Sequence, residues 1–156
     1  MPRSKKVESI GEELAVPSAK SAKKSRKGVS ITSVGRRKRA TASVLLTSGG
    51  SGVTVNNLSW DKYFSERPLT ARKVLRPLEA TNIADRFSVA ARVQGGGKAG
   101  QIDAVALGIA RAIVIFDPSL KPILRREGLI TRDSREKERK KPGFLRARKK
   151  PQYSKR

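Results

Sequence analysis

Large apolar residues almost disappear after position 130, and this boundary most constrains what the chain can fold into. Residues 131–156 contain only two large aliphatic or phenyl side chains, Phe144 and Leu145, beside 12 Lys or Arg residues. Such a segment buries too little apolar surface to offset the conformational entropy that it would lose on folding. We therefore expect an extended basic tail over 131–156, and any folded domain must precede it.

Positive charge is concentrated in this tail. Residues 1–30, 31–130 and 131–156 carry net charges of +5, +9 and +9, which sum to the formal net charge of +23. A surface of this kind indicates a polyanionic partner, most often a nucleic acid, with an anionic membrane or an acidic protein as weaker alternatives. Because no run approaches the roughly 18 apolar residues of a transmembrane helix, we expect a soluble protein with no membrane partner.

The chain has neither cysteine nor histidine. Disulfides, thiolate or imidazole metal sites, and every Cys or His nucleophile or base are therefore excluded. Asp133, Glu136 and Glu138 could form a carboxylate site, but each is flanked by Lys or Arg, which favours ion pairs that hold the arginines in register. We expect a non-enzymatic protein with no cofactor, no metal and no small-molecule substrate.

Residues 1–30 have no sustained apolar period, and we predict a disordered basic extension. The segment is basic and rich in serine, as transit peptides are, but Glu8, Glu12 and Glu13 count against that interpretation because such peptides are poor in acids. The run KKSRK resembles a nuclear signal, although short basic runs are mostly solvated tails. The role of the extension stays open at this level.

Residues 31–130 are expected to form a globular α+β domain. The segment 40–47, ATASVLLT, alternates apolar and polar residues, and the alternation resumes over 53–57 after a glycine-rich stretch, which predicts a hairpin. FSVAARVQ, residues 87–94, is a further strand. A short helix should follow Ser59 as N-cap, and it should place the single Trp60 in the core rather than in a base-stacking platform.

Three more helices are predicted in this domain. One begins at Thr70 and is disturbed at Pro77. The longest lies within 95–117, where apolar residues recur at spacings of three and four; the apolar face consists of Ile102, Val105, Ile109, Ile113 and Phe116. Its other positions are small, which allows a close approach to a sheet or to an RNA backbone. The last helix covers 120–127, with Gly128 as its C-cap.

The glycines before the long helix are the candidate binding element. Amides freed by Gly95, Gly96 and Gly97 can point at an anion, and the helix dipole favours negative charge there. Gly95, Gly97 and Gly100 also satisfy G-x-G-x-x-G, with Asp117 as a possible ribose ligand, but no further βα units follow to complete a dinucleotide fold. A P-loop fails because Ala99 follows Lys98. Nucleic-acid phosphate is favoured over a purely structural turn.

The motifs GRRKRATASV, QGGGKAGQ with IARAI, GLITRDSREKERKKPG and RARKKPQYSKR resemble the S-nine family of small-subunit ribosomal proteins, in order from about Val34 to Arg156. The resemblance implies a two-layer α+β sandwich with a mostly four-stranded sheet and helices on one face. It also implies a structural constituent of the cytoplasmic ribosome that supports translation. The expected partners are ribosomal RNA of the subunit head, neighbouring head proteins, and the peptidyl-site tRNA, which the C-terminal tail contacts.

The resemblance also assigns residues by motif position. The expected contacts to ribosomal RNA are Arg36, Arg37, Lys38, Gly95, Gly96, Gly97, Lys98, Arg139, Lys140, Lys141, Arg146 and Arg148. The expected tRNA contacts are Ser154, Lys155 and Arg156. Ala106 departs from the family, which often has Lys or Arg there. Two rival functions remain open: a histone-like DNA compactor, which the Lys, Ala and Pro of residues 15–27 favour, and a nucleotide-binding enzyme.

Overall fold

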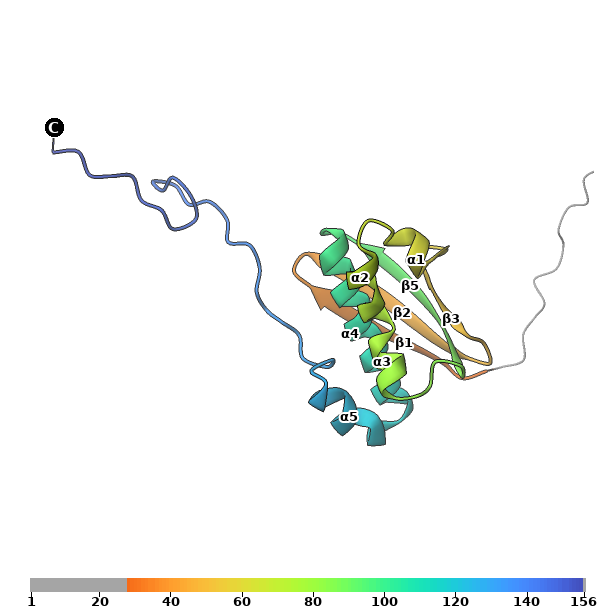
Figure 1. The fold of residues 1–156 in the computed structure, drawn as a ribbon. Coiled ribbons are helices and arrows are strands. Elements are labelled where there is room, and N and C mark those ends of the chain that lie inside the picture. Colours follow the sequence, from red (N-terminus) through yellow and green to blue (C-terminus); the bar gives the residue numbers. More distant parts are fainter. Residues whose placement is uncertain (1–27, 156) are drawn as a thin grey trace, which may run out of the picture.

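The structure, a computed structural model, describes residues 28–155, so that most of the predicted N-terminal extension lies outside the described residues. The described chain forms one mixed β-sheet with helices on one face, and a long tail leaves the domain after the last helix (Figure 1). The α+β sandwich with helices on one face is therefore confirmed.

The sheet has the order β1-β2-β5-β3-β4. Its strands are β1 (Ser30–Arg37), β2 (Ala40–Ser48), β5 (Phe87–Gln94), β3 (Gly52–Val55) and the two-residue β4 (Leu58–Ser59). Burial alternates along β2 and β5, as expected for strands with one covered face. Since β4 is so short, four strands carry almost the whole sheet, in line with the expectation, and β4 is a small fifth strand at the edge.

The predicted hairpin between β2 and β3 is wrong, because β5 lies between them. β2 pairs antiparallel with β5 over eight residue pairs, from Thr41 opposite Gln94 to Ser48 opposite Phe87. β3 has four residues and pairs in parallel with the other edge of β5. β5, which is longer than β3, thus takes the central place in the sheet. The alternation along β2 and β3 alone does not reveal this order. The hairpin that does form joins β2 to β1, a strand that the sequence did not single out.

Short helices connect β3 to β5. They are α1 (Trp60–Tyr63), α2 (Pro68–Ala71), the 3-10 helix η1 (Arg72–Val74) and α3 (Arg76–Ala80). Ser59 occupies the N-cap position of α1 as predicted, although its side chain makes no capping hydrogen bond. Pro77 lies in the first turn of α3, where its missing N–H is harmless, so it begins a new helix. Trp60 is half-buried and packs against the core, as expected.

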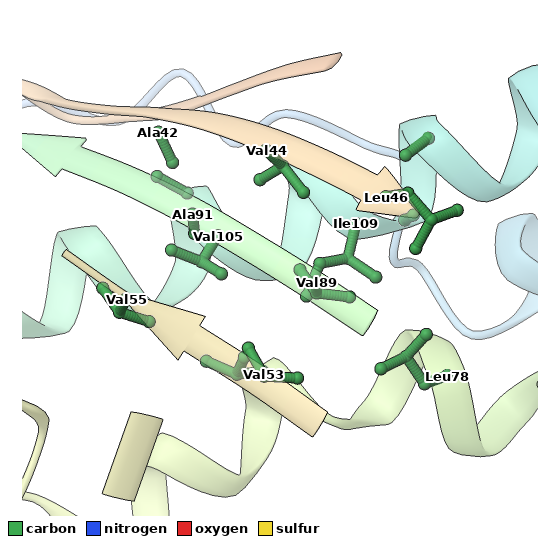
Figure 2. Packing of buried hydrophobic residues seen from close by; sticks show 14 of the residues in the cluster. Ala42, Val44, Leu46, Val53, Val55, Leu78, Val89, Ala91, Val105 and Ile109 are labelled. Carbon is green, nitrogen blue, oxygen red and sulfur yellow. The ribbon is translucent and has the colours of Figure 1, made fainter. Parts of the chain in front are cut away.

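Helix α4 (Lys98–Phe116) is the centre of the core (Figure 2). Ile102, Val105, Ile109 and Ile113 are fully buried against the sheet, whereas Phe116, the last residue of the predicted face, is 43% exposed. The helix is long and apolar enough to be a candidate membrane span by length and composition, but most of it is buried inside this domain.

Small residues bring α4 into direct contact with β1. A Cβ atom on Gly35 would overlap the carbonyl oxygen of Ala104, and one on Gly108 would lie 2.6 Å from a methyl carbon of Val44. The buried Ser33 hydroxyl donates a 2.6 Å hydrogen bond to the carbonyl oxygen of Gly108. The small face of α4 therefore packs against the sheet.

The domain closes with the 3-10 helix η2 (Pro118–Leu120) and helix α5 (Lys121–Arg126). Gly128 has φ of +69°. Its N–H donates to the carbonyl of Arg125, while the N–H of Leu129 donates to the carbonyl of Leu124. These two bonds form a Schellman motif, which confirms Gly128 as the terminator of this helix.

Candidate nucleic-acid interface

The glycine loop, residues 95–97, lies directly against the turn of the β1–β2 hairpin. Gly95 and Gly96 have φ of +71° and +63°. A Cβ atom on Gly95 would lie 2.6 Å from the carbonyl oxygen of Arg39, and one on Gly96 would lie 3.0 Å from the N atom of Ala40. These two glycines are therefore required by the backbone itself, which supports a structural role for them beside any binding role.

Gly97 differs from its two neighbours. It is the N-cap residue of α4, and a Cβ atom there would meet nothing within 4 Å. No side chain of the described residues caps this end of α4, and no acidic residue lies in its first turn. The first-turn amides thus lack an anionic protein partner, as an anion site at a helix N-terminus requires.

A buried glutamine holds the loop in place, and the sequence analysis missed it. The Gln101 side chain is 9% exposed, and its amide donates to the carbonyl of Gly95 at 3.1 Å. The Tyr63 hydroxyl lies 3.2 Å from the Gln101 carbonyl oxygen, and the Asn56 amide lies 3.3 Å from that hydroxyl. Polar residues that fall on the buried face of a helix were the available signal.

The half-buried Lys98 side chain contacts α1. Its ammonium donates to the carbonyl of Tyr63 at 3.2 Å and lies 3.7 Å from the centroid of the Tyr63 ring. The side chain thus fixes α1 against the start of α4 through a hydrogen bond and a cation–π contact.

The hairpin turn presents a run of cations beside the loop. Arg36, Lys38 and Arg39 are exposed, and Lys38 has φ of +52°. Arg37 is different, because only 14% of its side chain is exposed and its guanidinium is bound to the tail residues Asp133 and Arg135. Arg39 belongs to the same basic run but was missed, and the run itself was the signal that could have found it.

One groove collects the predicted residues from three parts of the chain. It is lined by Lys38 and Arg39 of the hairpin turn, Gly96 and Gly97 of the loop, and residues 136–140 of the tail, which include Arg139 and Lys140. A second groove is lined by Arg37, Lys38, Glu66, Arg67 and residues 96–100. We call these two grooves, with their lining residues, the glycine-loop face. Segments nearly 100 residues apart in sequence thus place cations and free helix amides side by side.

Three carboxylates pair with cations in the tail. Glu138 accepts from Lys141 at 2.7 Å and from Arg148 at 2.8 Å, and these two partners lower the pKa of Glu138 to about 2. Asp133 accepts from Arg135, which holds its pKa well below the usual range, and Glu136 lies 3.7 Å from Arg132. Among the described residues no group of carboxylates could hold a metal ion. Each of the three carboxylates thus forms an ion pair with a cation of the tail, as the sequence predicted.

The tail is not extended throughout. The N–H of Leu145 donates to the carbonyl of Lys149 at 2.7 Å, and Gly143 has φ of +76°. Residues 141–149 therefore fold back into a loop. Glu138 precedes this loop and forms ion pairs with its residues Lys141 and Arg148. Arg146 is exposed on the loop. The basic composition predicted an extended tail, and the Pro142-Gly143 pair was the one sequence feature that indicated this turn.

The end of the tail lies far from the sheet in Figure 1. Ser154 and Lys155 are exposed there, and Arg156 lies outside the described residues. Ala106, by contrast, is 8% exposed and lines a cleft together with Arg36, Lys73 and Arg76. Lys73 and Arg76 are further exposed cations that the sequence analysis did not select, because they belong to a short irregular helical segment.

The comparison with known families agrees with the geometry. The family model described as ribosomal protein S9/S16 matches residues 35–156, which is more than half of the chain. The matched range contains the hairpin turn, the glycine loop and the tail. This chain therefore belongs to the ribosomal protein S9/S16 family and is a structural, RNA-binding protein of the small ribosomal subunit.

Proposed function

We propose that the glycine-loop face binds phosphates of ribosomal RNA in the head of the small subunit, and that the end of the tail contacts the peptidyl-site tRNA. The supporting observation is the convergence of Lys38, Arg39 and the tail cations around the uncapped N-terminus of α4. Phosphates satisfy both kinds of donor, since they accept from backbone amides and from Lys and Arg side chains. Neighbouring head proteins complete the set of partners, in a cytoplasmic ribosome.

The same geometry disfavours nucleotide chemistry at this loop. Helix α4 continues through Phe116, so the segment that could have been a second Rossmann strand is helical. The Asp117 carboxylate accepts from the N–H of Ser119 at 2.9 Å and caps η2. Within residues 28–155 no strand follows α4, whereas a dinucleotide fold requires a parallel strand there. We propose a non-enzymatic role for the protein.

Two double variants test the glycine-loop face. Lys38→Gln with Arg39→Gln removes two cations from the groove, and Lys121→Gln with Arg125→Gln removes two exposed cations from α5 as a matched control. We would measure binding to a ribosomal RNA fragment across a salt series. The groove variant should flatten the logarithmic salt slope by about 1.4 to 1.8, because each lost phosphate contact is worth roughly 0.7 to 0.9.

The control variant should retain a slope close to that of the unchanged protein. Equal slopes for the groove variant and the unchanged protein would place the RNA elsewhere. Equal affinity for duplex DNA at the same salt concentration would favour the DNA-compacting function instead. Saturable binding of a free nucleotide would favour the enzyme.

A further inference from the structure

Arg37 joins the last residue of β1 to the start of the tail. One terminal nitrogen of its guanidinium donates to the carbonyl oxygens of Asp133 at 3.1 Å and of Arg135 at 2.9 Å. The other terminal nitrogen lies 2.8 Å from a carboxylate oxygen of Asp133. Its Nε lies 3.7 Å from a carboxylate oxygen of Asp103 in α4. A single side chain thus contacts the sheet's partner helix and two tail residues.

The tail side of this contact is itself held by hydrogen bonds. The Asp133 carboxylate accepts from the backbone N–H of Arg135 at 2.9 Å and from the Arg135 guanidinium at 2.8 Å. Just before it, Leu129 and Ile130 pack against the core. The chain is therefore held on both sides of Thr131, by apolar contacts before it and by charge-assisted hydrogen bonds after it.

The chain continues from this clamp to the glycine-loop face. Residues 136–140 begin one position after Arg135 and line the groove with Gly96 and Gly97. Arg37 lines the second groove of this face, but its side chain is only 14% exposed and both terminal nitrogens of its guanidinium already have protein acceptors. Arg36, the next residue, is exposed. Two adjacent arginines of one motif therefore have different environments.

We infer that Arg37 is a positioning residue, which sets the path of residues 136–140 across the glycine-loop face before RNA is bound and does not itself bind phosphate. Because a preordered segment loses less conformational entropy on docking, the clamp strengthens RNA binding without adding a contact. Lys cannot replace Arg37, since an ammonium cannot reach two carbonyls and a carboxylate in one plane. The effect on RNA affinity rests on the proposed function, whereas the effect on the tail path does not.

The first experiment measures the tail path in the full chain without RNA. Because the sequence has no cysteine, the double substitution Ser65→Cys with Lys137→Cys provides two unique sites for spin labels. The distance distribution between the two labels is then recorded. We expect a single narrow distribution in the labelled protein and in Arg36→Gln, and a broad one in Arg37→Gln and Arg37→Lys. Asp133→Asn removes the charge of the tail-side partner and changes no core residue, so it should broaden the distribution too. Narrow distributions in the Arg37 and Asp133 variants would overturn the inference.

The second experiment separates positioning from phosphate binding. The pair Arg37→Gln with Asp133→Asn leaves the net charge unchanged, and Arg36→Gln is the comparison. On a ribosomal RNA fragment, the pair should weaken binding about threefold to tenfold at every salt concentration with an unchanged salt slope. Arg36→Gln should flatten the slope by roughly 0.7 to 0.9. A flatter slope for the pair would show that Arg37 binds phosphate. Unchanged slopes for Arg36→Gln and for the groove variant would refute the proposed function, while the distance result would still stand.

Discussion

The domain and the tail of this protein reach order by different means. In the domain, Leu46, Ile109 and Leu124 are fully buried, and the apolar cluster is continuous from sheet to helices. In the tail, the largest apolar residue, Phe144, is only half-buried, and order comes from Arg37, Glu138 and a few backbone hydrogen bonds. Salt does not screen apolar burial, whereas it does screen exposed ion pairs. The domain should therefore keep its order at high salt, whereas the order of the tail should weaken as the salt concentration rises.

The largest effect should come from filling the contact between α4 and β1. Gly35→Val places a side chain where the Ala104 carbonyl already lies, so the helix must move away from the sheet. We expect the free energy of unfolding to fall by about 3 kcal/mol or more, in the upper range for overpacked cores. Urea unfolding checks this value. Gly97→Ala, in open space, is the control, and a loss at Gly35 no larger than in this control would contradict the packing account.

A smaller effect is expected at the glycine loop, on RNA binding alone. Gly96→Glu would combine charge with strain, since Gly96 has positive φ and a close neighbour. Gly97→Glu avoids both, and a carboxylate at a helix N-terminus does not destabilise the helix. Binding to a ribosomal RNA fragment should weaken about threefold to tenfold because the new charge repels phosphate. Gly97→Gln is the neutral control, and equal affinities of the Glu and Gln variants would favour a purely structural loop.

The sequence predicts those features of the fold whose pattern lies within contiguous residues. Strand 87–94 and the helix before Asp117 were predicted because period and length are properties of contiguous residues. Gly128 was predicted as a cap for the same reason. The pairing of β2 with β5 was missed because several alternating segments could pair equally well by their pattern, and the strand order joins residues far apart in the sequence.

The site shows the same limit. The basic run 36–39 and the glycine loop were found as motifs, but their proximity depends on the sheet order. The motif does not distinguish Arg36 from Arg37. In the structure, however, the Arg37 side chain binds Asp133, which is 96 residues away in the sequence. Gln101 was missed because its role on the buried face of α4 depends on its hydrogen bonds to Tyr63 and Gly95, which the sequence does not show.

The end of the tail should contribute a modest effect on tRNA binding. Deleting Ser154, Lys155 and Arg156 removes two side-chain cations and leaves the domain intact. We expect subunit assembly to be unchanged and the logarithmic salt slope of tRNA binding to purified small subunits to flatten by about 1.5. The loss of affinity should correspond to roughly 1.5 to 3 kcal/mol at most, the range for a hydrogen bond to a charged group. Truncated subunits with the same affinity and slope would mean that the tail ends short of the tRNA.

The smallest effect concerns pH and the loop 141–149. The partners of Glu138 lower its pKa to about 2, so its ion pairs are fully present above the ordinary carboxyl range and are lost as the pH falls toward 2. Backbone NMR of the full chain should show the loop signals shifting to random-coil positions only near that pH. Glu138→Gln should give those positions already at pH 7. A loop that keeps its signals in this variant is held by the backbone alone.

The central claim is that the domain folds without the tail, while the tail provides a large part of the RNA contact. The most direct measurement compares the full chain with a chain ending at Ile130, by thermal unfolding and by RNA binding across a salt series. The account predicts midpoints within a few degrees of each other and a salt slope lower by at least about 3, since the tail carries 12 Lys or Arg residues and 3 acids. An unchanged slope, or a truncated chain that does not fold, would contradict it.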